Sequence, residues 1–451
     1  MRAASRLPLE TSLPHPYSRA MLRPLTLAGV VWLAVALAPS QAMAQAAPVY
    51  VQFEPFTVKG ALYRPAPGRE RDVAVLLIHR VNNYLGHIAA SELAQRGFLV
   101  LAMNSRFDND EASVVWQTLA QDVETGVNYL RQQRGIRRVV LFGHSGGAAT
   151  LSFYQAVAEH GTAYCDTPQK LSRCGPDLAH LPKADGLILV DSSLGNPVGL
   201  LRSLNPAVTK EGDPASIDPS LDPFNPANGF NASGTSTYSD AFRKRYAAAQ
   251  SARMNRLLSM AIAGAESILS SRTPFPDDNV FLIVRAGGAA LPDPSARRTT
   301  RPQKLLKNDG SIATEIVQSV APPSAPNPAL NAQFQGGARL LTLKSFLSAN
   351  AIRSTNSATG IDWCSSNAST MCAVGQISVP LLVSAMGASG GLRDGEALYD
   401  AAASRDKDFV VAEGATHNIV PCLECETHPG QYDRATRNFF DYVARWINAR
   451  F

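Results

Sequence analysis

Apolar runs of strand length alternate with helical segments in the first half of the chain. The runs DVAVLLIHR, FLVLAMNSR, RRVVLFGHSGG and ADGLILVDSS lack the polar alternation of a half-exposed strand, which indicates strands covered on both faces. The first three are followed by segments with helical spacing, HIAASELAQRG, LAQDVETGVNYLRQQRG and AATLSFYQAVAEHG. This alternation predicts βαβ units and so an α/β fold, with a mostly parallel central sheet and helices on both faces.

The same rhythm returns near the end of the chain, where VPLLVSAMG and DFVVAEGA are predicted strands and GEALYDAAASR and QYDRATRNFFDYVARWINARF are predicted helices. Residues 49–65, before the first run, alternate and predict one or two antiparallel strands. Residues 195–375 break the pattern, because they are rich in Pro, Asn, Asp and Ser around one long helical stretch. We expect a sheet domain of residues 45–194 and 376–451, with residues 195–375 as a large irregular and helical cap or lid (the inserted segment).

Residues 1–44 have the pattern of a secretory signal peptide. Two arginines precede an apolar run from Leu25 to Leu37, which is short for a membrane-spanning helix, and a small-x-small site ends at Ala44. We expect cleavage near Ala44–Gln45, a periplasmic or secreted mature protein, and no membrane attachment after the signal is removed. An uncleaved membrane anchor is the alternative.

The composition is that of a globular protein, 45% hydrophobic and 18% charged. The first 44 residues carry four Arg and one Glu, so only about +2 of the formal net charge of +5 belongs to the remainder. No basic run is present, so nucleic acid is not an expected partner. The composition gives no indication of oligomeric state.

The six cysteines all follow the predicted signal peptide and fall into three short-range pairs. An even number of cysteines in an exported chain predicts disulfides. Sequence proximity favours the pairs Cys165–Cys174, Cys364–Cys372 and Cys422–Cys425. A zinc half-site and a redox dithiol are alternative interpretations of the last pair, although zinc would need further ligands at a suitable spacing.

The pentapeptide Gly143-His144-Ser145-Gly146-Gly147 matches G-x-S-x-G and stands between a predicted strand and a predicted helix. A nucleophilic serine on such a turn needs small neighbours, because strand and helix approach closely there. The first helical N–H groups then point toward the site where an oxyanion would develop. The alternative is a structural serine in a glycine-rich turn.

In these residues the chain resembles the α/β-hydrolase family, over about residues 50–195 and 375–451. The resemblance implies the order nucleophile, acid, histidine, with Ser145 as the nucleophile. His417, in GATHN after a predicted strand, lies where the family places its base. The implied protein is an exported, esterase- or lipase-like serine hydrolase that cleaves small carboxylic esters through an acyl-enzyme and needs no metal or organic cofactor.

The position of the acidic member of the implied Ser–His–acid triad departs from the family pattern. The family places Asp or Glu shortly after the strand that here is VPLLVSAMG, but residues 388–391 are Ala-Ser-Gly-Gly. Asp191, at the end of an earlier strand, is the first substitute, and Glu396, with Asp394 nearby, is the second. Glu413 precedes the histidine loop and is expected to brace it.

The oxyanion hole is expected to use the N–H of Gly146 and a second N–H from Val81 or Arg80. His79 ends the strand before this loop and is expected to stiffen it. Arg80 stands where the family commonly has glycine. Its guanidinium could hold a substrate carboxylate bidentately, or it could pair with an acidic residue or point to solvent.

Two other functions fit the same residues. An amide or peptide hydrolase, or an acyltransferase, would use the same nucleophile, base and acid. A non-catalytic binding protein on this fold would explain the missing carboxylate after VPLLVSAMG.

Overall fold

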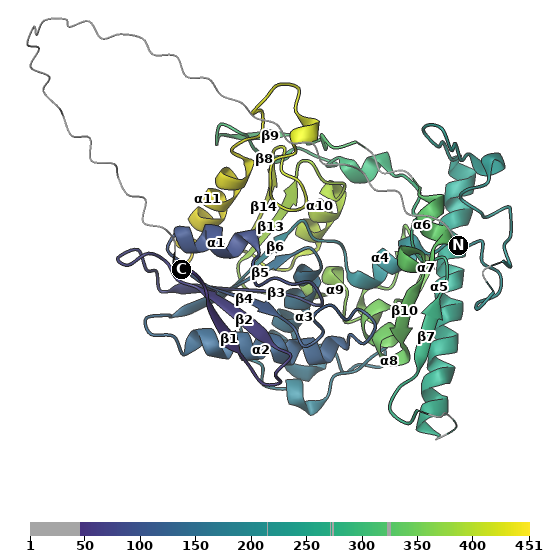
Figure 1. Cartoon of the computed structure of the whole chain (residues 1–451), viewed down its shortest axis with the longest axis horizontal. Helices are drawn as coiled ribbons and strands as arrows, with labels where there is room; N and C mark the ends of the chain where they lie inside the picture. The colour runs from purple at the N-terminus through teal and green to yellow at the C-terminus, as the bar shows by residue number, and fades with distance from the viewer. Residues whose placement is uncertain (1–45, 214, 271, 273–274, 323–325) are drawn as a thin grey trace, which may run out of the picture. The chain divides into compact units, whose positions relative to one another are not determined.

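Ten strands form one sheet in the computed structural model of the protein (Figure 1). From edge to edge they are β1 (Val49–Gln52), β2 (Lys59–Tyr63), β4 (Leu99–Asn104), β3 (Val73–His79), β5 (Arg138–His144), β6 (Gly186–Val190), β13 (Leu381–Met386), β14 (Lys407–Ala412), β8 (Gln303–Leu306) and β9 (Ile312–Glu315). The structure describes residues 46–451 except 214, 271, 273–274 and 323–325. The predicted signal peptide, with its cleavage near Ala44–Gln45, therefore lies outside the described residues.

Parallel pairing runs without a break from β4 to β8, and only the two edges are antiparallel. β1 pairs with β2 and β2 with β4 at one edge, and β9 pairs with β8 at the other. Strands β3 and β4 are buried along their whole length, as expected for strands with helices on both sides. The structure therefore confirms the mostly parallel sheet.

Helices cover both faces of the sheet. Helices α2 (Trp116–Arg131), α3 (Gly146–His160), α9 (Thr370–Val374) and α10 (Leu392–Ala401) share one apolar core, and α1 (Ile88–Gln95) and α11 (Ala435–Asn448) share the other. Alternate residues of a strand divide between the two cores because successive side chains point to opposite faces. In β3, Leu76 and Ile78 belong to the core with α2 and α3, whereas Val75 and Leu77 belong to the core with α1 and α11.

Most of the inserted segment forms a third apolar core. This core is built from α4 (Asn196–Ser203), α5 (Asp240–Leu269), β7 (Val280–Ile283), β10 (Arg339–Thr342) and α8 (Leu343–Ser345). The inserted segment also contains α6 (Pro328–Ala332), α7 (Phe334–Gly337) and the strand pair β11 (Ser354–Asn356) with β12 (Gly360–Ile361), and β7 pairs with β10. Leu201 of α4, Met254 of α5 and Ile283 of β7 meet in this core. The long helical stretch expected here is α5. Among the described residues, no helix combines the length and apolar character needed to cross a membrane.

Two strands of the inserted segment join the main sheet. β8 pairs parallel with β14, and β9 pairs antiparallel with β8. Neither strand is predicted from its sequence, because QKLL and IATE are four residues long and carry no clear apolar pattern. The range 195–375 therefore contributes one edge of the sheet as well as the third core.

The three disulfides have the predicted pairing, Cys165–Cys174, Cys364–Cys372 and Cys422–Cys425. Each closes a loop of a few residues outside the sheet strands. The last two cysteines follow His417, and the N–H of Cys422 donates to the carbonyl oxygen of Gly414 at 2.9 Å. The Cys422–Cys425 disulfide therefore lies in the same loop as His417.

Replacing Phe439 on α11 by Ala should destabilise the fold by about 3–5 kcal/mol, the usual cost of removing a buried phenylalanine ring. Phe439 is fully buried in the core that α11 shares with α1. Arg437→Ala, on the exposed side of the same helix, should change the free energy of unfolding by less than about 0.5 kcal/mol. Denaturant titration of both variants measures the difference, and equal effects would contradict the assignment of the buried face.

Candidate active site

Strands β3 and β5 are neighbours in the sheet, but the chain leaves them toward opposite faces. After β3 it continues into α1, and after β5 it continues into α3. Such a reversal leaves a crevice beyond the carboxyl ends of the strands, where α/β proteins bind ligands. Ser145 follows β5 at this edge, and the loop 80–84 follows β3.

Ser145 occupies a strained turn between β5 and α3. Its φ of 53° and ψ of −128° lie in a region that non-glycine residues rarely adopt, and its N–H donates to the carbonyl oxygen of Val190 at 3.0 Å. A Cβ on Gly143 would lie 2.9 Å from the backbone nitrogen of Ala148. A Cβ on Gly147 would collide with the carbonyl oxygen of Ile78. The two outer glycines of G-x-S-x-G therefore permit the close approach of β5, α3 and β3.

The structure brings Ser145, His417 and Asp191 together in one chain of hydrogen bonds. His417 Nε2 lies 3.0 Å from Ser145 Oγ, and His417 Nδ1 lies 2.6 Å from Asp191 Oδ2. Asp191 Oδ2 can only accept, so Nδ1 carries the proton that it donates to Asp191, and Nε2 is left to accept from the serine hydroxyl. These are the distances that activation of a serine by a base requires.

Asp191 reaches His417 because β6 ends at the same edge of the sheet as β14. Its side chain is only 3% exposed, and its φ of 44° turns the chain out of β6. The N–H of Met386, the last residue of β13, donates to its Oδ1 at 3.2 Å. The hydrogen bond to Asp191 raises the pKa of His417 above 6.5, against a smaller opposing effect of burial.

The other candidate acids are engaged elsewhere. Glu396 accepts from the N–H and hydroxyl of Thr300, both at 2.7 Å, and from the side-chain amide of Gln303 at 2.8 Å. Asp394 lies 3.7 Å from the guanidinium of Arg202. Glu413 pairs with Lys307 and accepts from the N–H of Asn308 at 2.8 Å. Of these three carboxylates and Asp191, only Asp191 bonds to His417.

The loop after β3 does not present the N–H of Val81 as the oxyanion donor that was expected. The N–H groups of Val81 and Asn82 both donate to His79 Nδ1, at 3.1 and 2.8 Å. The N–H of Val81 thus points to an imidazole nitrogen. Arg80 forms an ion pair with Glu111, with Nε at 3.1 Å and Nη2 at 3.0 Å from the same carboxylate oxygen. A Cβ on Gly146 would collide with Arg80 Nη1, so the guanidinium lies beside the turn that carries Ser145.

Two buried histidines, His87 and His144, support the loop of His417, a role that was not predicted from the sequence. The N–H of Ala89 donates to His87 Nδ1 at 3.1 Å, so His87 Nε2 donates to His144 Nδ1 at 3.0 Å. His144 Nε2 then donates to the carbonyl oxygen of His417 at 2.7 Å. Burial lowers the pKa of His87 to about 3 and that of His144 to about 4, so both rings are neutral near pH 7.

No signal in the sequence links these histidines, because 57 residues separate His87 from His144 and 273 separate His144 from His417. Tyr84 completes the arrangement by donating its hydroxyl to the carbonyl oxygen of His144 at 2.8 Å. The backbone of the base and the backbone of the serine turn are thereby fixed to one another.

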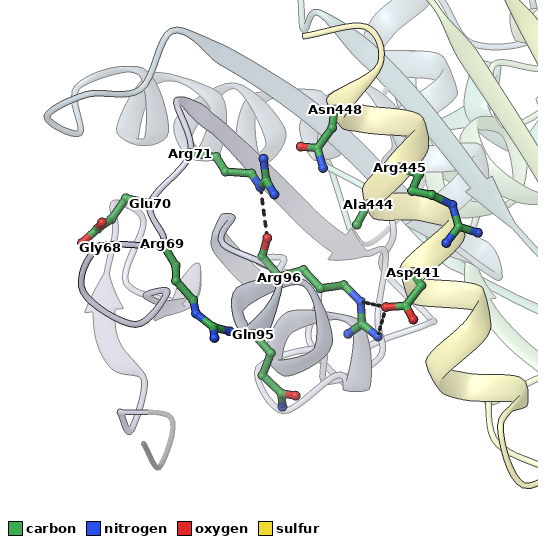
Figure 2. A pocket seen from close by; sticks show the side chains of 10 residues that line it. All are labelled: Gly68, Arg69, Glu70, Arg71, Gln95, Arg96, Asp441, Ala444, Arg445 and Asn448. Carbon is green, nitrogen blue, oxygen red and sulfur yellow. Dashed lines mark hydrogen bonds and ion pairs between the residues drawn. The ribbon is translucent and has the colours of Figure 1, made fainter. Parts of the chain in front are cut away.

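Two surface hollows are separate from this site. One, of about 670 Å³, is lined by Gly68, Arg69, Glu70, Arg71, Gln95, Arg96, Asp441, Ala444, Arg445 and Asn448 (Figure 2). Within it Arg96 bonds to Asp441, and Arg71 Nε donates to the carbonyl oxygen of Arg96 at 3.1 Å. A second hollow, of about 490 Å³, lies between α5 and the β11–β12 pair. Neither is lined by Ser145, His417 or Asp191.

One group of potential metal ligands occurs in the described part of the chain, Cys422, Glu424 and Cys425. Its two sulfur atoms are joined in a disulfide, so neither is a thiolate that could bind zinc. The disulfide therefore argues against the zinc half-site considered for this pair.

No protein-family profile and no curated protein matches the sequence. Solved structures similar to the chain include the siderophore hydrolase EstB from Aspergillus fumigatus (12% identity, 91% of this chain and 98% of that chain, TM-score 0.43). A carboxyl esterase from Bacillus coagulans is 12% identical, with 90% of this chain and 99% of that chain covered and a TM-score of 0.38. A hypothetical protein from Pseudomonas aeruginosa is 14% identical, with 90% of this chain and 95% of that chain covered and a TM-score of 0.40. Because these sequence identities and TM-scores are low, the assignment of an α/β-hydrolase fold rests on the strand order and on the serine turn between β5 and α3.

Replacing Gly147 by Ala should lower the rate of fluorophosphonate labelling of Ser145 by at least about 10²-fold, because the added methyl group displaces the serine turn from Ile78. Gly199→Ala, on α4, is the matched control, since a Cβ there meets nothing within 4 Å. Labelling rates of the two purified variants test this. Equal rates would show that the turn tolerates the methyl group.

The reactivity of Ser145 should fall as the pH drops through a midpoint above 6.5, because His417 accepts the serine proton only when neutral and its pKa is raised. Asp191→Asn removes the main cause of the raised pKa and should move the midpoint to lower pH. The rate of fluorophosphonate labelling, measured from pH 5 to 9, gives both midpoints. A wild-type midpoint below 6.5 would contradict the Asp191–His417 contact.

Proposed function

We propose that the protein is an exported serine hydrolase that cleaves carboxylic esters of small molecules. The observation that carries this proposal is the unbroken chain of hydrogen bonds from Ser145 Oγ through His417 to Asp191. The side chain of His417 is 48% exposed, so the reacting end of this chain is open to a substrate. The buried Asp191 carboxylate holds the ring from the other side.

The reaction follows from these contacts. Ser145 Oγ adds to the acyl carbon while its proton passes to His417 Nε2, and the carbonyl electron pair moves onto oxygen. The bond to the alcohol then breaks, and His417 returns the proton to the departing oxygen. Water repeats the sequence on the acyl-enzyme and releases the acid. Asp191 stabilises the imidazolium that forms in each step.

Export is supported by the cysteines as well as by residues 1–44. All six are joined in disulfides, as expected for a protein that folds in an oxidising compartment. Three disulfides are unusual for a chain of ordinary composition that stays in the cytoplasm. We therefore propose that the mature protein functions in the periplasm or outside the cell.

Ser145→Ala should abolish both fluorophosphonate labelling and the hydrolysis of p-nitrophenyl esters. Asp191→Asn should lower kcat by about 10⁴-fold, the size of the loss seen when the orienting acid of such a triad is replaced. Glu396→Gln is the control for the acid, because Glu396 bonds to Thr300 and Gln303 and should leave kcat of the folded enzyme nearly unchanged.

Esters of graded acyl length and matched anilides complete this experiment, because they separate ester from amide cleavage. A folded wild-type protein that neither reacts with the probe nor hydrolyses any ester would refute the proposed function. A loss in Glu396→Gln that matched the loss in Asp191→Asn would refute the assignment of the acid.

A further inference from the structure

The backbone of the loop after β3 is already bonded within the protein. The N–H of Val81 is held by His79 Nδ1 at 3.1 Å. The Val81 carbonyl oxygen accepts from the N–H of Asn109 at 2.8 Å, and the Arg80 carbonyl oxygen accepts from Ser105 Oγ at 2.5 Å. These bonds fix the loop in a form that turns the N–H of Val81 away from an incoming oxyanion. The second donor that a tetrahedral intermediate requires is then a group of this loop other than the Val81 amide.

The guanidinium of Arg80 is a charged donor that lies beside Gly146, whose N–H faces the expected position of that oxyanion. Glu111 accepts from Nε and Nη2, which leaves Nη1 without a hydrogen-bond partner among the described residues. Nη1 faces Gly146, because a Cβ there would collide with it. The Arg80 side chain is only 17% exposed, so the Glu111 pair holds it in one place with little competition from water.

Gly146 supplies the first donor. It is the first residue of α3, so its N–H has no acceptor within the helix and lies at the positive end of the helix dipole. His79 also faces this point, since a Cβ on Gly146 would lie 2.5 Å from its Nε2. Because Nδ1 accepts two backbone N–H groups, the proton of His79 lies on Nε2, directed at the same region.

We propose that the Arg80 guanidinium, through Nη1–H, is the second donor of the oxyanion hole and takes the place of the Val81 backbone amide. This inference rests on the proposed function. As Ser145 Oγ bonds to the acyl carbon, the carbonyl electron pair moves to oxygen, and the resulting negative charge is held between Gly146 N–H and Arg80 Nη1–H. When the bond to the alcohol breaks, the electron pair returns to carbon and the oxygen is again a neutral acceptor.

A full positive charge suits this position because it interacts with the oxyanion more strongly than with the neutral carbonyl of the substrate. An interaction that strengthens in the transition state raises kcat and leaves substrate binding nearly unchanged. A clamp for a substrate carboxylate, the other role considered for Arg80, would instead act on KM and only for anionic esters. The two roles therefore give different kinetics.

The experiment compares Arg80→Gln and Arg80→Lys with wild type on neutral p-nitrophenyl butyrate and on the anionic mono-p-nitrophenyl succinate. We expect kcat for the neutral ester to fall by about 10²–10³-fold in Arg80→Gln, the range seen when one oxyanion donor is removed. Arg80→Lys, which keeps the charge, should lose less. KM for the neutral ester should stay within a few fold, and the affinity for phenylboronic acid, which forms a tetrahedral anion on Ser145, should fall in parallel with kcat.

Two further measurements separate catalysis from folding. In Arg80→Gly, added guanidinium ion at millimolar concentration should restore part of kcat, which a merely structural role of Arg80 would not allow. Thermal unfolding of each variant shows whether the fold is kept. Glu111→Gln should lose less activity than any Arg80 variant, because an amide oxygen can still accept from the guanidinium.

Unchanged kcat for the neutral ester in folded Arg80→Gln would overturn the proposal. A loss confined to KM for the anionic ester would overturn it as well and identify a carboxylate clamp. Failure of the proposed function is a separate result, since it would appear as a folded wild-type protein that neither reacts with the fluorophosphonate probe nor hydrolyses either ester, or as turnover that survives Ser145→Ala.

Discussion

The hydrogen bond between Asp191 Oδ2 and His417 Nδ1 joins two residues that are 226 positions apart in the chain. The whole inserted segment lies between them in sequence. The bond forms because β6 and β14 flank β13 in one parallel register, which brings their carboxyl ends to one edge of the sheet. The stability of that sheet therefore determines whether Ser145 has a base held in place by an acid.

Much of this arrangement could be predicted from local patterns. The apolar runs gave the central strands, and G-x-S-x-G between strand and helix gave the serine turn. Asp191 could be proposed in place of a carboxylate after β13, because some members of the family that the chain resembles carry their acid at the end of the strand that here is β6.

The rest depends on contacts that no local pattern encodes. The sequence does not reveal that His79 would take the N–H of Val81, or that Glu111 would turn Arg80 toward Gly146. The support of His417 by His144 joins loops that are distant in sequence. Strands β8 and β9 were missed because edge strands of four residues carry little apolar pattern, so pairing with β14 decides their structure.

The position of β8 and β9 in the sheet limits which parts of the inserted segment can change in length. The inserted segment is joined to the sheet domain at both ends and also at its middle, through β8 and through the bonds of Glu396 to Thr300 and Gln303. The inserted segment therefore cannot be removed as a unit. Its deletion would remove two edge strands from the sheet and leave the Glu396 carboxylate without its hydrogen-bond donors. A change of length in the inserted segment that keeps this edge of the sheet must therefore fall before β8 or after β9.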